Sequence, residues 1–296
     1  MLVVIALTSA PVAADVSVRV RESSFSVGRI PPQSQSIVET SVKGAMRRVE
    51  TLTQGAPGDS SGRPVHSVQL DRIDRDSSFY FRPGDSLYLP VALAGVRASN
   101  RRGAEAFARA RAEGTAPRDT LAAVRTTDLG RSRTILGTDC KGIVLEMRFT
   151  YRDSAMTNGE ELTGVLTDTV WLAPLASAPG ELRRFEQDFA RATVSDSFLA
   201  AANAVQLAQA RGQGLVSVLQ RALRALPGYP LESTFINRLH GLPRGLELGE
   251  GVERRPDGAV IVQRTVREAI AISDAPLAAE RFEVPRGTAP VATRRP

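Results

Sequence analysis

The sequence contains few of the residues from which catalytic and metal sites are most often built. Its 296 residues include one cysteine, Cys140, and two histidines, His66 and His240. A single cysteine permits no internal disulfide, and two distant histidines with one cysteine do not form a zinc ligand set. The acidic clusters, such as Glu160-Glu161, lack the spacing of a calcium-binding loop. We therefore expect neither a metal nor another cofactor.

Aromatic residues and lysine are also scarce. Aromatic residues make up 5% of the chain, which leaves few platforms for stacking nucleic-acid bases. The formal net charge is +6 and the pI is about 10.2, yet the positive charge is almost entirely arginine. The arginines are scattered in pairs such as Arg47-Arg48 and Arg254-Arg255 and form no basic cluster. This pattern is typical of a solvated surface, and we expect no nucleic-acid partner.

Long apolar runs are missing, and only the N-terminus carries a short one. The run over residues 2–7 is too short to cross a bilayer, so no stable membrane span is expected. It is followed by small residues at Val12-Ala13-Ala14, which is typical of a signal peptide over residues 1–14 cleaved before Asp15. The usual basic residues before the run are missing, which is compatible with a start further upstream. We expect a periplasmic or secreted protein; the alternative is the buried first strand of a cytosolic protein.

Most of the remaining chain has the two-residue period of β-strands. The stretch "DVSVRV" alternates valines with polar residues, and "SIVETSVKGAMRRVETLTQG" predicts two strands joined at Lys43-Gly44. Similar strands follow up to residue 174 and return after residue 228, including "ERFEVP" at 280–285. Residues 101–113 predict a largely polar helix, interpreted as a mobile insertion. The short spacings favour an antiparallel sheet, and the fold class is mainly β with α (α+β), in a single domain over residues 15–296.

Residues 180–226 change to a helical period. Leu182, Phe185 and Phe189 fall on one helical face, and Leu219 and Leu223 share another. Amphipathic helices of this length can close as a lid over the concave apolar face of a curved sheet. Such a lid either fills the space with its own side chains or leaves room for a ligand, and the residues alone leave both alternatives open.

The motif "GDSSG" at residues 58–62 raises the possibility of a serine hydrolase. Its nucleophile would be Ser60 or Ser61, which needs an oriented general base. His66 lies too close in sequence unless the chain folds back, and His240 is predicted to lie in a loop. The strand–turn–helix context of a nucleophile elbow is also missing, so a surface turn is favoured.

An ordered set of short motifs resembles an exported bacterial family of unknown function. The motifs are "VKGAMRRVE", "VQLDRIDRDSSFYFRPGDSLYLP", "TILGTDC", "TDTVWLAP", "LPGYPLES" and "ERFEVPRGTAPV". Thr138 and Thr288 stand where the family pattern has tyrosine. That family is similar in fold to the periplasmic lipoprotein carriers LolA and LolB. The resemblance implies an unclosed antiparallel β-barrel with a helical lid over an apolar cavity, and it places Cys140 as a buried thiol at the start of a central strand.

The function expected from these observations is non-enzymatic binding of an apolar small molecule, a lipid or a lipoprotein acyl chain beneath the lid. The alternatives are a cell-envelope scaffold or interaction module with a filled core and a protein partner and, more remotely, a serine hydrolase. The residues predicted to line the cavity and lid are Trp171, Leu182, Phe185, Phe189, Leu219 and Leu223.

Overall fold

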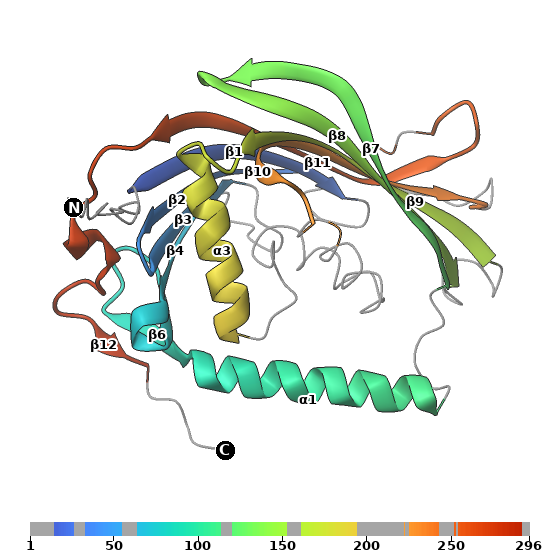
Figure 1. The fold of residues 1–296 in the computed structure, drawn as a ribbon. Coiled ribbons are helices and arrows are strands. Elements are labelled where there is room, and N and C mark those ends of the chain that lie inside the picture. The colour runs from blue at the N-terminus through green and yellow to red at the C-terminus, as the bar shows by residue number, and fades with distance from the viewer. Residues whose placement is uncertain are drawn as a thin grey trace, which may run out of the picture.

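The computed structural model of the chain contains one twelve-stranded sheet and two α-helices in its described part (Figure 1). It describes residues 15–26, 33–54, 64–113, 120–152, 161–193, 222, 225–242, 252 and 254–291. The strands are β1 (Val16–Ser26), β2 (Gln33–Lys43), β3 (Met46–Gln54), β4 (Val65–Arg72), β5 (Ser77–Phe81), β6 (Leu87–Ala92), β7 (Thr120–Ile135), β8 (Thr138–Arg152), β9 (Glu161–Pro174), β10 (Gly228–His240), β11 (Val260–Ser273) and β12 (Ala289–Pro290). The helices are α1 (Leu93–Ala112) and α3 (Pro179–Thr193), with short 3₁₀ turns η1 (Ile73–Arg75) and η2 (Ala279–Phe282).

The sheet is open at both edges. Its strand order is β12-β6-β5-β4-β3-β2-β1-β11-β10-β9-β8-β7, so β12 and β7 are the edge strands. All neighbouring strands are antiparallel except β12 and β6, which are parallel. Figure 1 shows the sheet arching over α3, while α1 runs along the open side of the arch. The predicted fold class, an unclosed antiparallel sheet with a helix across its concave face, is confirmed.

Local sequence explains the strand pattern. In β1, Val16, Val18 and Val20 are buried and the residues between them are more exposed, as the alternation predicts. The predicted hairpin at Lys43-Gly44 joins β2 to β3, and Gly44 has a φ of 55°, which glycine adopts without the steric cost that other residues meet. The sequence therefore predicts this half of the sheet well.

The predicted helix over residues 101–113 begins earlier and is anchored. Helix α1 starts at Leu93, directly after β6 and without a breaker between them. Arg97 donates a 2.7 Å hydrogen bond to the carbonyl oxygen of Ala192, and the Asn100 amide donates one of 3.0 Å to the carbonyl oxygen of Thr193. The first half of α1 therefore contacts the end of α3 and is not an isolated insertion.

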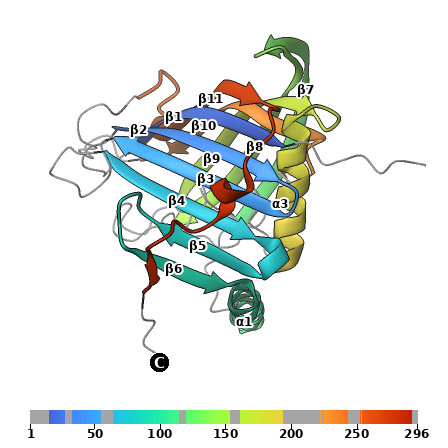
Figure 2. The same cartoon turned by 90° about the vertical axis from the view of Figure 1, so that its left-hand side faces the viewer.

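The segment after β11 crosses the convex face of the sheet, and we call residues 274–291 the C-terminal strap. Figure 2 shows it passing over β3 and β4, on the opposite side from α3. The strand predicted from "ERFEVP" is wrong: residues 279–282 form the η2 turn, whose Phe282 is buried. Arg72 donates a 2.6 Å hydrogen bond to Glu283, and Val284 packs against the cluster of Val68, Leu70 and Phe81. Side-chain contacts with the sheet therefore hold this segment where a β-ladder was expected.

Cys140 is buried at the start of β8, as predicted, but β8 is the second strand from the β7 edge and not a central strand. Its side chain is inaccessible to solvent and its thiol donates a 3.4 Å hydrogen bond to the carbonyl oxygen of Thr138. Burial raises the pKa of the thiol, which lowers the fraction of the reactive thiolate.

We expect the native protein to react with a water-soluble thiol reagent about 100-fold or more slowly than the protein unfolded in guanidinium, because reaction requires local opening. Timed labelling at pH 8 followed by mass spectrometry measures both rates. Equal rates in the two states would show that Cys140 is accessible in solution.

Candidate functional site

Helix α3 lies against the concave face of the sheet and packs mainly on β10, β1, β2 and β9 (Figure 1). Its apolar face carries Leu182 and Phe185, which are almost completely buried. From β3, the Arg47 guanidinium lies over the rings of Phe185 and Phe189, 5.0 and 4.9 Å from their centroids. The same guanidinium forms a 2.8 Å ion pair with the fully buried carboxylate of Asp71. Arg47 thus connects the helix to the sheet by cation–π contacts and a buried ion pair.

Four of the six residues predicted to form the cavity and lid come together in one cluster. Leu182 and Phe185 are part of it, and Trp171 and Phe189 pack against it half-buried. The Trp171 ring lies beneath the guanidinium of Arg133, 4.7 Å from the ring centroid. Leu219 and Leu223 lie outside the described residues. The structure thus places the four described positions in or against one cluster, and their role as ligand contacts stays a prediction.

A second buried cluster, which we call the apolar wall, covers the concave face of the three strands β8, β9 and β10. Its residues are Ile143, Leu145, Met147, Phe149, Leu166, Val170, Leu172 and Phe235, together with Leu226 just before β10. Ala222 packs against this wall. Both Ala222 and Leu226 belong to the chain segment that links α3 to β10, within the predicted lid of residues 180–226. Side chains from three strands and from this lid segment thus meet at the wall.

Beside the apolar wall lies a group of charged and amide side chains that sequence reasoning missed, and we call it the polar cluster. It consists of Glu22 on β1, Asp168 on β9, Asn237 on β10, Arg267 on β11 and Glu186 on α3. Arg267 Nε lies 3.3 Å from Glu22 Oε2. The side-chain oxygens Glu22 Oε2, Asp168 Oδ1, Glu186 Oε2 and Asn237 Oδ1 are buried and accept no hydrogen bond from the described residues.

Burial dominates the protonation of the three carboxyl groups in the polar cluster. It raises the pKa of Asp168 to about 7 against the opposing effect of the Arg267 guanidinium. It also raises the pKa of Glu186 to about 7, with Arg47 among the arginines that oppose it. The pKa of Glu22 is raised by burial as well, again opposed by Arg267. The interior therefore holds carboxyl groups that change charge near neutral pH, which is uncommon outside functional sites.

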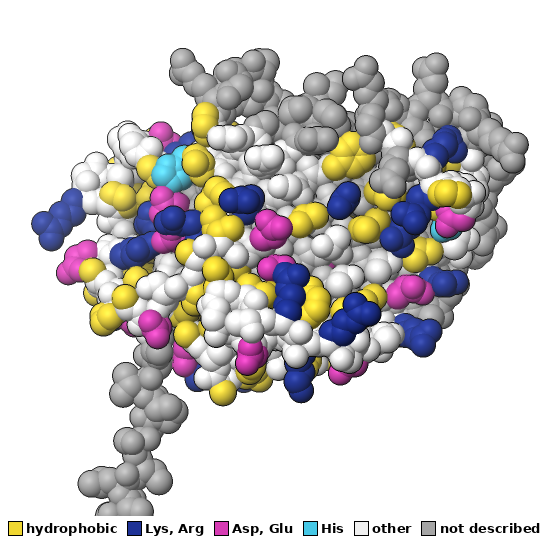
Figure 3. Space-filling view, turned by 90° about the horizontal axis from the view of Figure 1, so that it is seen from above, with side chains coloured by type: hydrophobic (Ala, Val, Ile, Leu, Met, Phe, Trp, Pro, Cys, Tyr) yellow, Lys and Arg dark blue, Asp and Glu magenta, His cyan; other side chains and the backbone are white. Residues whose placement is uncertain are grey.

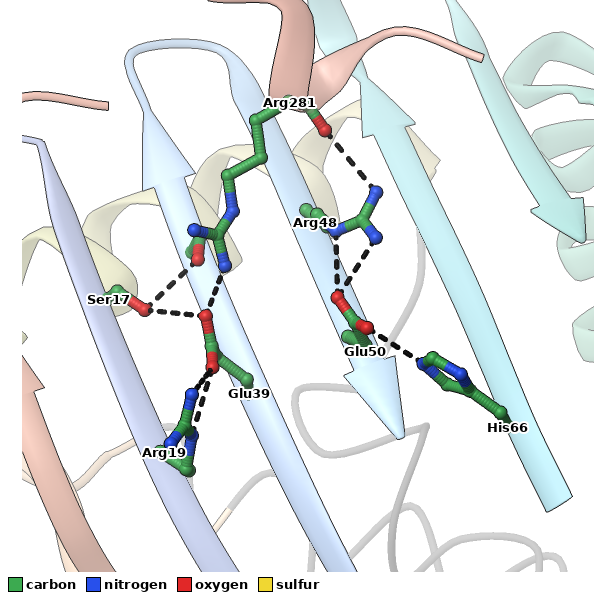
Figure 4. Close-up of polar contacts among 8 residues, drawn as sticks. Ser17, Arg19, Glu39, Arg48, Glu50, His66 and Arg281 are labelled. Atoms are coloured by element: carbon green, nitrogen blue, oxygen red, sulfur yellow. Dashed lines mark hydrogen bonds and ion pairs between the residues drawn. The ribbon is translucent and has the colours of Figure 1, made fainter. Parts of the chain in front are cut away.

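The convex face carries a groove of about 920 Å³ between the C-terminal strap and the outer side of β1–β4. Figure 4 shows the polar side chains of this groove, where two carboxylates each accept hydrogen bonds from two basic side chains. Glu39 accepts a 2.9 Å hydrogen bond from Arg19 and another from Arg281 of the strap. Its cross-strand neighbour Glu50 accepts bonds from Arg48 and, at 2.7 Å, from His66. Adjacent like charges in a sheet are destabilising, and the guanidinium groups of Arg19, Arg48 and Arg281 compensate for them.

The remaining surface observations bear on the alternatives. His66, on β4, is hydrogen-bonded to Glu50. His240 lies on β10 and not in a loop, and it lines a separate groove of about 550 Å³. Ser60 and Ser61 lie outside the described residues, so the structure does not place a nucleophile beside either histidine. Figure 3 shows basic side chains spread over the upper convex face and interspersed with acidic and apolar ones. This visible part of the surface presents no continuous basic patch of the kind that binds nucleic acid.

Two searches of the described residues gave negative results. No described helix is both long enough and apolar enough to cross a membrane. No group of three or more His, Cys, Asp or Glu side chains in the described ranges is arranged to hold a metal ion. The predicted signal peptide over residues 1–14 lies outside the described residues, and the structure describes the chain from Asp15 onward.

Comparison with known proteins shows no family for the chain. No protein-family model matches the chain, and no curated protein sequence matches it. Among solved structures, the chain is similar to the crystal structure of LprF from Mycobacterium bovis, with 11% sequence identity and a TM-score of 0.31. The alignment covers 94% of this chain and 92% of LprF. The resemblance of the sequence motifs to an exported bacterial family therefore stays a prediction, and the fold assignment rests on the strand order and the position of α3.

Proposed function

We propose that the protein is a non-enzymatic, exported binder of an apolar or amphiphilic ligand, held between the concave face of the sheet and the lid segment. The observation that carries the proposal is the apolar wall. Three adjacent strands present aliphatic and aromatic side chains on the concave face, interrupted by Asp168, and Ala222 and Leu226 of the lid segment pack against them. In the proposal the ligand lies on this wall, beside Ala222 and Leu226.

The separation of the apolar wall from the cluster that contains Leu182 and Phe185 supports the proposed binding function. Helix α3 packs on the sheet through Leu182 and Phe185, and Arg47 connects it to β3. We therefore expect α3 to stay in place when a ligand binds. The lid contacts on the apolar wall come from the chain beyond this anchored helix. Burying an alkyl chain against the wall contributes about 0.8 kcal/mol per methylene, and because this gain must exceed the cost of association, a long chain is favoured over a short one.

The first test is native mass spectrometry of the protein purified without detergent from the cells that produce it, followed by organic extraction. A co-purifying acyl lipid or other apolar species identifies the ligand class. A polypeptide mass that begins at Asp15 establishes cleavage of the signal peptide. If no apolar compound co-purifies and none binds when added, the filled-core scaffold takes the place of the carrier.

The Leu145→Trp variant distinguishes a ligand space from a filled core. Leu145 lies in the apolar wall on β8. If the wall lines a ligand space, the indole occupies that space, the free energy of unfolding changes by less than about 1 kcal/mol, and ligand affinity falls about tenfold or more. If the wall is filled core, overpacking costs about 1–3 kcal/mol.

Denaturant unfolding and displacement of N-phenyl-1-naphthylamine fluorescence measure the two effects of Leu145→Trp. The matched control is Leu182→Trp on α3, which lies in the closely packed cluster and should be destabilised in either case. Equal destabilisation of the two variants would contradict a ligand space at the wall.

A further inference from the structure

The polar cluster contains buried oxygen atoms that accept no hydrogen bond from the described residues. These atoms lie within and beside the apolar wall. Asp168 and Asn237 are more than nine-tenths buried, and the Oδ1 atom of each accepts no hydrogen bond from the described residues. Glu22 is in the same condition at Oε2, although it has Arg267 as an ion-pair partner at 3.3 Å. Buried acceptors without partners are rare in native proteins, and each calls for an explanation.

The strand register places these acceptors within the wall. Asp168 pairs with Leu145 on one side and with Phe235 on the other, and both neighbours belong to the apolar wall. Asn237 pairs with Leu166, which is also part of the wall. Asp168 and Asn237 are therefore diagonal neighbours across β9 and β10, close enough for two atoms of one small polar group to reach both.

The far side of the cluster is polar as well. On β11, Thr265 pairs with Phe235 and with Ser24 of β1, and the Ser24 and Thr265 hydroxyls lie 3.1 Å apart in a buried contact. The concave face thus carries polar side chains at Thr265 on β11 and at Glu22 and Ser24 on β1, next to the apolar wall on β8–β10, while Asp168 lies inside that wall. An amphiphile has the same division between its chain and its head group.

Building on the proposed function, we propose that Asp168 and Asn237 bind the head group of a single-chain amphiphile by accepting hydrogen bonds from its hydroxyl or amine groups. The alkyl chain lies on the apolar wall. Asn237 Oδ1 is an acceptor, and Asp168 Oδ1 is one when the carboxyl is ionised, above its pKa of about 7, so at that pH the head group must supply donors. A ligand with the same chain but no donors leaves both acceptors unsatisfied and binds more weakly.

Three probes with the same twelve-carbon chain test the head-group preference. Below their aggregation limits, 1-monolauroylglycerol supplies hydroxyl donors, dodecylamine supplies an amine, and methyl laurate supplies no donor. Dissociation constants come from displacement of N-phenyl-1-naphthylamine. We expect one or both donor-bearing probes to bind about tenfold more tightly than methyl laurate, and the stronger of the two identifies the donor as hydroxyl or amine.

The Asp168→Leu, Asn237→Leu double variant assigns that preference to these residues. The ratio of affinities should fall to near one, with methyl laurate binding at least as well as before. The control is Glu146→Gln, whose side chain lies on β8 beside a groove that faces away from the wall, and it should keep the wild-type ratio.

Two failures have different meanings. Equal binding of all three probes to the wild type, or a preference that persists in the double variant, overturns the head-group site and leaves the apolar binding function intact. If none of the three probes displaces the dye or binds by calorimetry, the proposed function itself fails and the head-group site fails with it.

Discussion

The Arg47→Ala variant is expected to lose about 3–5 kcal/mol of the free energy of unfolding at pH 7, because it leaves the Asp71 carboxylate buried without its cation. Asp71 is fully buried, and Arg47 contacts it through Nε at 2.9 Å and Nη2 at 2.8 Å. Ser78 donates to the same carboxylate at 2.6 Å, so part of the solvation remains. The alanine also removes the guanidinium from the Phe185 and Phe189 rings. Denaturant unfolding followed by circular dichroism gives the loss directly.

Two further variants separate the charge from the packing contribution of Arg47. In Arg47→Met, Asp71→Asn neither buried charge is present, and the longer methionine side chain still packs on the phenylalanine rings, so at least about half of the lost stability should return. The matched surface control is Arg19→Ala, whose half-exposed pair with Glu39 on the convex face is worth about 1 kcal/mol or less. A loss of similar size in Arg47→Ala and Arg19→Ala would contradict the role of Arg47 as the connection between α3 and the sheet.

The parts of the fold that follow from local pattern were predictable. The valines of β1 repeat every second residue, and Lys43-Gly44 lies between two such runs, so strands and hairpin could be placed without tertiary information. The strand prediction at residues 280–285 is wrong because Phe282 and Val284 alternate with charged residues, as apolar residues do in a strand. The strap contacts the sheet through the Phe282 and Val284 side chains and through ion pairs. The local alternation of apolar and polar residues does not distinguish such side-chain packing from pairing as a β-strand.

The polar cluster could not be predicted because its members are joined only by the fold. Glu22 follows the buried valines of β1 at the same period, but a charged residue in that place normally suggests that the strand has reached solvent. Asp168 stands between threonines in "LTDTV", which resembles an exposed strand segment. Arg47 and α3 are separated by more than a hundred residues of sequence, so their contact has no local signal. Helical period alone did identify Leu182, Phe185 and Phe189, since amphipathic spacing is itself the signal for burial.

The Asp168→Asn variant is expected to be more stable than the wild type at pH 8 and to lose this advantage at pH 5. Burial raises the pKa of Asp168 from an ordinary 3.8 to about 7, so the folded state holds a proton that the unfolded state has released between those two values. Stability therefore falls as the pH rises from about 4 to about 7 and stays low above that. The full shift corresponds to an upper limit of about 4 kcal/mol, and relaxation around the ionised carboxylate should reduce the measured gain of the asparagine variant to about 1–2 kcal/mol.

Asp74 is the matched control, because its pKa moves in the opposite direction. A hydrogen bond from Arg72 lowers the pKa of Asp74, so its ionised form stabilises the fold above pH 4 and this contribution disappears as the pH falls through the lowered value. Asp74→Asn should accordingly be less stable than the wild type at pH 8 and approach it in acid. Free energies of unfolding of the three proteins, measured at half-unit intervals from about pH 2 to pH 8.5, should give difference curves of opposite sign. If the curve for Asp168→Asn is flat, the carboxyl is solvated in both states, and the concave face is open to water at the position where the head group is proposed to bind.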